Sequence, residues 1–249
     1  MKQLLVWTTL IGFSSIGGAV WAAAPQADSA SYRFELRALG GNVGEAVLSL
    51  GKVKRVGKRS LRPVRIDATT GGLAEKVMKT TVSATDWVDT SSGFPARGRW
   101  DSEDKKGKRI VKARYDGKRI RGEDFRNGKL RRKLDKTLKQ RANGLVSVFG
   151  WLINQKSLTP GTKIETPIYD GRRVYHATFS VASVERIHVP VGVRKALKVT
   201  VKVTRPDKAC YRKDLTFWID PKDHTPYKLA FSYGVLGDVV AALTGKKIS

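Results

Sequence analysis

Three tight-turn signals in the middle of the chain constrain the fold most. Asp116-Gly117, Asn127-Gly128 and Asp170-Gly171 each separate short segments with alternating apolar residues. Asn-Gly and Asp-Gly accept the positive φ angles that a type I′ turn demands, so they are the strongest short signals for β-hairpins. Three such pairs in one region predict an antiparallel sheet.

Alternating segments extend this sheet along most of the chain. In residues 196–204, Leu197, Val199, Val201 and Val203 share one face, while Lys198, Thr200 and Lys202 share the other. Further strands are expected at 32–37, 45–51, 61–69, 77–85, 215–220 and 227–233; residues 235–243 fit a strand or a short helix, and a strand is preferred.

One helix is expected within residues 138–155, where Leu138, Leu145, Val148, Phe149 and Leu152 recur at helical spacing. About eleven strands with this helix predict a mainly β fold, either a large curved antiparallel sheet or an open β-barrel with one packed helix.

The first 22 residues have the layout of a secretory signal peptide. Lys2 supplies a positive start, residues 4–20 carry no charge, and Val20-Trp21-Ala22 offers a small-residue cleavage site. The alternative is a retained membrane anchor, but the apolar run is short for a span. The only Cys in the chain is Cys210, so a lipoprotein anchor near the cut is excluded.

We therefore expect a periplasmic or secreted protein. The expected organisation is a signal peptide at 1–22, a flexible leader at 23–31 and a single β-rich domain at 32–249. Nothing after residue 22 is long and apolar enough to span a membrane as a helix.

The charge balance points to anionic partners. The chain has 48 Lys and Arg against 22 Asp and Glu, a net charge of +26, of which only Lys2 leaves with the signal peptide. Such a surface attracts polyanions in a salt-sensitive way. The alternative is charge that merely keeps the protein soluble.

The basic excess is concentrated in residues 97–141, with 19 Lys and Arg against 7 Asp and Glu. Outward positions on alternating strands there would form one cationic face, and arginine forks match phosphate and carboxylate groups. The candidate anion-binding residues are Lys105, Lys106, Lys108, Arg109, Lys118, Arg119, Arg121, Arg131 and Arg132. An anionic envelope lipid or polysaccharide is the expected partner. Nucleic acid is disfavoured because aromatic residues are sparse in this segment and because export takes the protein away from the compartment that holds nucleic acid.

The sequence offers little support for an enzyme. His176, His188 and His224 lie on separate segments without metal spacing, so no metal or cofactor is expected. The carboxylate pairs Glu103-Asp104 and Glu123-Asp124 are interpreted as surface ion-pairing groups within basic loops. A hydrolase acting on envelope polymer remains an alternative, and it would need His176 or His188 to meet a carboxylate or Cys210.

A second alternative is a carrier of an apolar ligand. Most aromatic residues are expected to fill the core, but some could line the mouth of an open barrel that takes an acyl chain. The residues concerned are Phe149, Trp151, Tyr169, Tyr175, Phe179, Phe217, Trp218 and Phe231.

Several strings resemble a family of exported bacterial proteins. They include Tyr32-Arg-Phe-Glu-Leu, Phe149-Gly-Trp-Leu, Ile168-Tyr-Asp-Gly171, Leu215-Thr-Phe-Trp-Ile-Asp220 and Pro226-Tyr-Lys-Leu. The chain resembles the domain of unknown function 3108 family from about residue 31 onward. The resemblance implies an extracytoplasmic β-rich fold and supplies no catalytic residue. The Arg and Lys excess in residues 97–141 departs from the family pattern.

Overall fold

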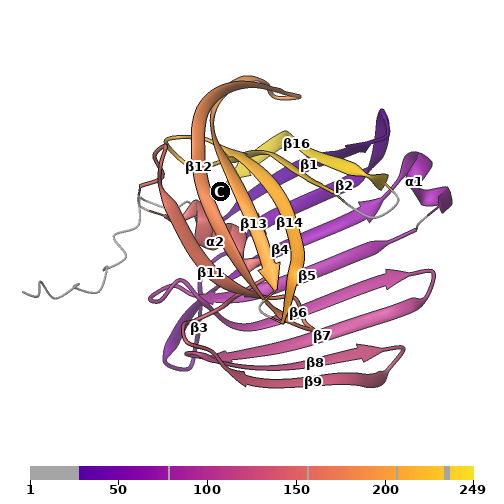
Figure 1. The fold of residues 1–249 in the computed structure, drawn as a ribbon, viewed down its shortest axis with the longest axis vertical. Helices are drawn as coiled ribbons and strands as arrows, with labels where there is room; N and C mark the ends of the chain where they lie inside the picture. Colours follow the sequence, from indigo (N-terminus) through magenta and orange to yellow (C-terminus); the bar gives the residue numbers. More distant parts are fainter. Residues whose placement is uncertain (1–27, 78, 156, 206, 233–235) are drawn as a thin grey trace, which may run out of the picture.

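The computed structural model describes residues 28–77, 79–155, 157–205, 207–232 and 236–249, and its strands form one sixteen-stranded sheet (Figure 1). The predicted signal peptide lies outside the described residues. The first nine strands are β1 (Ala30–Ala38), β2 (Gly41–Leu50), β3 (Lys54–Val56), β4 (Arg59–Thr70), β5 (Thr81–Asp89), β6 (Pro95–Asp104), β7 (Gly107–Asp116), β8 (Arg119–Arg126) and β9 (Lys129–Thr137).

The later strands are β10 (Asn143–Gly144), β11 (Lys163–Tyr169), β12 (Val174–Val189), β13 (Gly192–Arg205), β14 (Lys208–Ile219), β15 (Pro226–Ser232) and β16 (Asp238–Ile248). The helices α1 (Gly72–Val77) and α2 (Ser147–Ile153) accompany them.

The strand order runs β10-β11-β12-β13-β14-β15-β16-β1-β2-β4-β5-β6-β7-β8-β9, with β3 paired to β4. Every pair is antiparallel except β10 with β11. Strand β1 lies between β16 and β2, so the first and last strands join the two halves of the chain in mid-sheet. The predicted mainly β fold with a large curved antiparallel sheet is confirmed.

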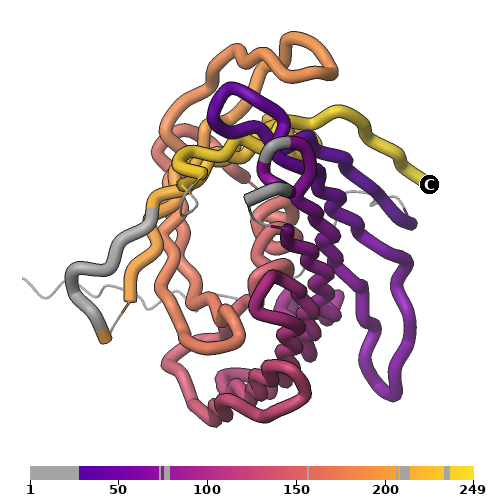
Figure 2. Tube along the Cα trace, turned by 90° about the vertical axis from the view of Figure 1, so that its right-hand side faces the viewer, coloured from indigo at the N-terminus to yellow at the C-terminus, as the bar shows by residue number. Residues whose placement is uncertain are grey.

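The sheet rolls up around an open centre (Figure 2), and contacts of β10 with β6 and of Tyr169 with Gly122 bring the β10–β11 end onto the inner face of the first half. The Tyr169 side chain at the end of β11 lies directly over the backbone of Gly122 in β8, and its ring centroid is 5.9 Å from that of Trp100 in β6. Asp86 in β5 accepts hydrogen bonds from the backbone of Val146 and Ser147 at the start of α2. These contacts place α2 on the inside of the roll.

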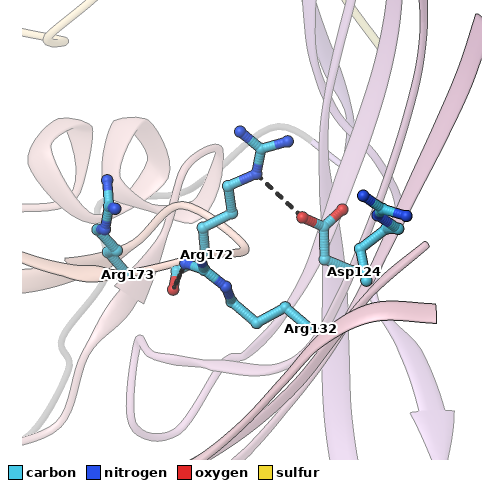
Figure 3. A pocket seen from close by; sticks show the side chains of 5 residues that line it. Asp124, Arg132, Arg172 and Arg173 are labelled. Atoms are coloured by element: carbon cyan, nitrogen blue, oxygen red, sulfur yellow. Dashed lines mark hydrogen bonds and ion pairs between the residues drawn. The ribbon is translucent and has the colours of Figure 1, made fainter. Parts of the chain in front are cut away.

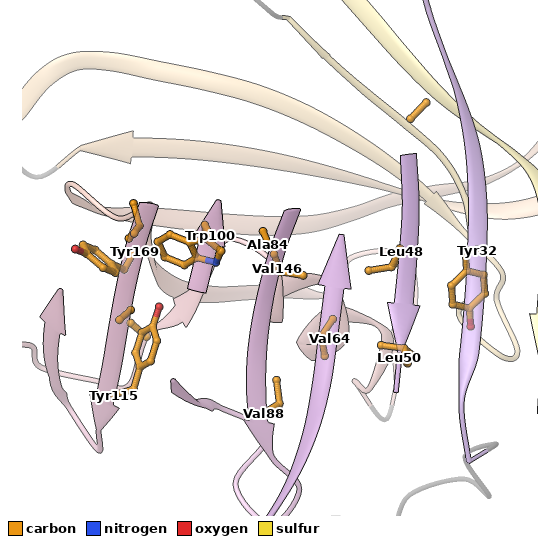
Figure 4. Packing of buried hydrophobic residues seen from close by; sticks show 14 of the residues in the cluster. Tyr32, Leu48, Leu50, Val64, Ala84, Val88, Trp100, Tyr115, Val146 and Tyr169 are labelled. Carbon is orange, nitrogen blue, oxygen red and sulfur yellow. The ribbon is translucent and has the colours of Figure 1, made fainter. Parts of the chain in front are cut away.

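Alternation along the strands separates the core from solvent. In β7, Val111, Ala113 and Tyr115 are buried, whereas Lys112 and Arg114 between them are exposed. The inward residues of β1 to β8 form one apolar cluster with Tyr169 and Val146 (Figure 4). A second cluster surrounds α2 and contains the inward face of β13, where the predicted alternation is confirmed. We call the side that carries these clusters the inner face.

The turn predictions are confirmed in part. Asn127 and Gly128 both have positive φ angles, of 50° and 76°, and form the two-residue β8–β9 turn as expected. In the β7–β8 turn the central residues are Gly117 and Lys118, because Asp116 pairs with Arg119. Asp170-Gly171 begins a longer loop that extends to Arg173, because β12 starts only at Val174.

The bounds of one predicted helix and of one predicted strand were inaccurate. The expected helix across 138–155 is only Ser147–Ile153, because Asn143 and Gly144 pair with β11 and Asp86 binds the amides of Val146 and Ser147. The short helix α1 replaces the start of the strand expected at 77–85, and β5 begins at Thr81 instead.

Two strand predictions can also be compared with the structure. Strand β1 begins at Ala30, so the last two residues of the expected flexible leader pair with β2 and β16. At the other end of the chain, β16 confirms the preference for a strand near 235–243.

Candidate anion-binding sites on two faces of the sheet

A row of arginines crosses the outer face of the basic half. Arg97 in β6 lies opposite Arg114 in β7, which lies opposite Arg121 in β8. Directly opposed residues on antiparallel strands have Cβ atoms about 5 Å apart, so like charges repel there. Arg121 is 3.9 Å from Asp135, whereas neither Arg97 nor Arg114 forms an ion pair with any carboxylate that the structure describes. We call Arg97, Arg114 and Arg121 the arginine row.

The neighbouring outer positions add further cations. Arg99, Lys112 and Lys133 follow in the next row, where Glu123 lies between the two lysines and Arg99 forms an ion pair of 2.8 Å with Asp101. The guanidinium of Arg97 also lies 4.4 Å from the ring centroid of Trp87 in β5, a cation–π contact that holds it over the face of the sheet.

The nine predicted anion-binding residues do not share one face. Lys108, Arg119 and Arg121 lie on the outer face, where Arg119 forms two hydrogen bonds of 2.7 Å to Asp135. Lys105 and Lys106 occupy the β6–β7 turn and Lys118 the β7–β8 turn at the opposite end of these strands. Arg132 lies on the inner face because it pairs with the buried Asp124. Arg109 lies there because it alternates in step with the buried Val111. Arg131 occupies a β-bulge in β9. The expectation of one cationic face is therefore wrong for these inner residues.

Part of this basic set lines a pocket of about 250 Å³ on the inner face. Its lining residues are Asp124, Arg131, Arg132, Arg172 and Arg173, and we call it the arginine pocket (Figure 3). Strands β8 and β9 provide the first three, and the β11–β12 loop provides Arg172 and Arg173. The pocket thus joins two segments that are far apart along the chain.

Asp124 is the anchor of the arginine pocket. It is 3 % exposed, and it accepts hydrogen bonds from Nε of Arg109 at 2.8 Å and from Nε of Arg172 at 3.0 Å. Burial alone would raise the pKa of the Asp124 carboxyl, but the two guanidinium groups outweigh burial and hold it below its ordinary value. Asp124 stays ionised and fixes the β11–β12 loop to the inner face of β8.

The loop that carries Arg172 and Arg173 is itself rigidly built. Asp170 Oδ1 accepts the backbone N–H groups of both arginines, at 2.8 Å and 2.7 Å. Gly171 has a φ of 86°, and a Cβ there would meet the side chains of Val111 and Trp100 at less than 3 Å. The loop therefore needs glycine to approach the inner face this closely.

Sequence reasoning missed Asp124, Arg172 and Arg173 as site residues. Asp124 was expected in a surface loop, but it lies buried in β8. Arg172-Arg173 directly follows the Asp170-Gly171 turn signal, and reading that turn as two residues placed both arginines in the next strand. The signal that could have indicated this site was the pair of arginines, Arg172-Arg173, directly after a turn.

The other candidate chemistries gain no support from geometry. His176 and His188 are exposed residues of the same curved strand, β12, and lie twelve residues apart, at most about 40 Å of extended chain. The Nδ1 atom of His224 lies 2.7 Å from the backbone oxygen of Ile153. The side chain of Cys210 lies outside the described part. Among the described residues there is no group of three His, Cys, Asp or Glu side chains placed to hold a metal ion.

Four of the eight aromatic residues named for a carrier, Phe149, Trp151, Phe179 and Phe217, pack against one another around α2. Ring centroids are 5.4 Å apart for Phe149 and Phe217, 5.6 Å for Trp151 and Phe179, and 6.5 Å for Phe179 and Phe217. They belong to the second apolar cluster. Of the helices that the structure describes, none combines the length and apolar character needed to cross a membrane.

Comparisons with solved structures support the fold. A β-barrel-like protein of the domain of unknown function DUF1849 from Brucella abortus is similar over 90% of this chain and 99% of its own, with a TM-score of 0.60 and 12% identity.

Two further structures are more distant. An exported-protein candidate with a YmcC-like fold from Bacteroides fragilis has a TM-score of 0.37 and 10% identity, covering 92% of this chain and 100% of its own. A lipoprotein candidate from Parabacteroides distasonis has a TM-score of 0.38 and 10% identity, covering 90% and 97%.

No curated protein matches the sequence. The model of a family described as protein of unknown function (DUF3108) matches residues 30–244, which is most of the chain. The chain therefore belongs to the DUF3108 family.

Proposed function

We propose that this protein is an exported, non-enzymatic binding protein that docks on an anionic component of the cell envelope through the outer face of β6–β9. The arginine row is the observation that carries the proposal. Three guanidinium groups stand side by side at the spacing of adjacent strands, and two of them have no ion-pair partner among the described carboxylates. A bound polyanion would relieve their mutual repulsion.

Phosphate headgroups of membrane lipid are the preferred ligand, and acidic polysaccharide is the second. A sheet face presents its cations in a plane, and a membrane surface presents its phosphates in a plane. Each Lys or Arg close to an anionic membrane contributes about 1 kcal/mol to binding. The export signal in residues 1–22 would bring the protein to such surfaces.

Docking is favoured over the two alternatives by specific contacts. Four of the eight aromatic residues that a lipid carrier could use at its mouth are packed against one another around α2, and Tyr169 is packed in the first apolar cluster. A hydrolase would need His176 or His188 to meet a carboxylate or Cys210; both histidines are exposed on β12, and neither contacts a carboxylate that the structure describes.

Vesicle co-sedimentation tests the docking function. We expect binding to vesicles of phosphatidylcholine mixed with phosphatidylglycerol, little binding to phosphatidylcholine alone, and steep weakening as salt rises. The double variant Arg114→Ala/Arg121→Ala should weaken binding about thirty-fold, since it loses about 2 kcal/mol.

The matched control is Arg186→Ala/Lys195→Ala. These two exposed cations also oppose each other across a strand pair, but on β12–β13, far from the arginine row in the strand order. Their loss should change binding less than three-fold. Equal weakening by both double variants, or binding that is insensitive to salt, would show that the arginine row is not a docking site.

A further inference from the structure

The arginine pocket is a second cationic site, separate from the arginine row because it opens on the inner face. Its lining holds four guanidinium groups and one carboxylate, a net charge of +3. Arg109 adds one more positive charge behind Asp124, at 2.8 Å. Four arginines that face one hollow repel one another, so the pocket favours an anion of more than one charge.

Much of the donor capacity in the pocket is unused. Arg172 donates to Asp124 through Nε only, which leaves its two terminal nitrogens available. Arg132 makes one long contact of 3.4 Å, from Nη1 to the backbone oxygen of Arg172. Arg131 and Arg173 form no ion pair within the described part of the chain. Asp207 attracts Arg173 from a distance, but its own close partner is Arg205.

We propose that the arginine pocket binds a phosphoryl group carrying at least two negative charges. Arg131 and Arg132 line the pocket from β9, and Arg172 and Arg173 line it from the β11–β12 loop, so guanidinium groups border it on two sides. Figure 3 shows Arg172 directed towards Asp124 and Arg173 on the other side of Arg172. The tetrahedral oxygens of a phosphoryl group can accept from several directions at once, whereas a planar carboxylate is satisfied by one guanidinium fork. The pocket volume of about 250 Å³ is roughly eight water volumes, enough for a phosphoryl group and part of its substituent.

Binding in this pocket would also tie the roll of the sheet together. The β11–β12 loop reaches β8 through Asp124, whereas its contact with β9 in the described residues is the single 3.4 Å hydrogen bond from Arg132 to the backbone oxygen of Arg172. A phosphoryl group between Arg131 or Arg132 and Arg172 or Arg173 would add charge-assisted hydrogen bonds to this long one and strengthen the link from β9 to the loop. A ligand that binds only this closed arrangement stabilises the folded protein.

Isothermal titration calorimetry at constant ionic strength tests the proposal. The probes are inorganic diphosphate, short-chain phosphatidic acid as a lipid phosphomonoester, and succinate as a dicarboxylate. We expect at least one phosphoryl probe to bind ten-fold or more tightly than succinate. Binding of diphosphate indicates a free phosphorylated ligand, and binding of phosphatidic acid alone indicates a lipid headgroup; both support the phosphoryl site.

Paired variants locate the binding. Arg131→Ala/Arg173→Ala removes two exposed side chains of the pocket and should weaken the phosphoryl probe ten-fold or more, with an unchanged melting temperature without ligand. Arg114→Ala/Arg121→Ala removes the same charge from the outer face and should change binding less than two-fold.

Three outcomes would overturn the pocket proposal: no phosphoryl binding, succinate binding as tightly, or equal losses in both double variants. Because vesicle docking depends on Arg114 and Arg121, and the pocket on Arg131 and Arg173, either function can fail without the other.

Discussion

At the scale of single residues, Asp86 is the group on which the interior depends most. It is fully buried, and it accepts hydrogen bonds from the amides of Val146 at 3.1 Å and Ser147 at 2.8 Å and from Nε1 of Trp100 at 3.2 Å. One carboxylate thus joins β5, β6 and the start of α2. Burial raises its pKa from 3.8 to about 6, although these donors oppose the rise.

This raised pKa predicts a distinctive dependence of stability on pH. The folded protein keeps the Asp86 proton up to about pH 6, whereas the unfolded chain releases it near pH 3.8. The contribution of Asp86 to the free energy of unfolding is therefore full below pH 3.8 and is lost as pH rises to about 6. The difference between the wild type and Asp86→Asn should fall by about 3 kcal/mol across this window in urea denaturation.

An exposed carboxyl provides the control for Asp86. Hydrogen bonding to Arg119 lowers the pKa of Asp135, so its contribution is lost only as pH falls below about 3.8. The difference between the wild type and Asp135→Asn should stay flat between pH 4 and pH 6. A flat difference for Asp86→Asn as well would contradict the buried role assigned to Asp86.

At the scale of elements, the contact of β11 with β8 closes the roll. Only glycine at position 122 leaves room for Tyr169, because a Cβ on Gly122 would lie 1.9 Å from the tyrosine hydroxyl oxygen. Tyr169 is 1% exposed and packs against Trp100, so it cannot move aside without cost.

Substitution of Gly122 by alanine should loosen this closure. We expect Gly122→Ala to lower the free energy of unfolding by about 1–3 kcal/mol, the usual cost of overpacking. The matched control is Gly245→Ala in β16, where a Cβ meets nothing within 4 Å and the stability should not fall. Chemical denaturation of both variants measures the difference, and equal stabilities would show that β11 does not close on β8.

The elements that local pattern determines were predictable, and those that tertiary contacts determine were not. The alternation in β13 and the Asn127-Gly128 turn follow from short-range chemistry, and both predictions are confirmed. The start of α2 depends on Asp86, about 60 residues earlier, so the helical spacing in 138–155 could not reveal it. The arginine pocket depends in the same way on the approach of Arg172 to Asp124, 48 residues apart.

At the scale of the whole molecule, rolling the sheet divides the basic segment between two faces. Successive side chains of a strand point to opposite faces. Arg97, Arg114 and Arg121 therefore lie on the outer face. Arg109 and Arg132 stand at the alternate positions and lie on the inner face. The composition predicted a surface that attracts anions, but only the rolled sheet assembles a plane of cations outside and a pocket of cations inside.

In this assembly the two ends of the sheet meet at the arginine pocket. Amide hydrogen exchange with and without inorganic diphosphate tests it most directly. We expect diphosphate to slow exchange in β9 and in the β11–β12 loop together, with little change in the β12–β13 hairpin. Protection of only one of the two segments, or none in either, would contradict it.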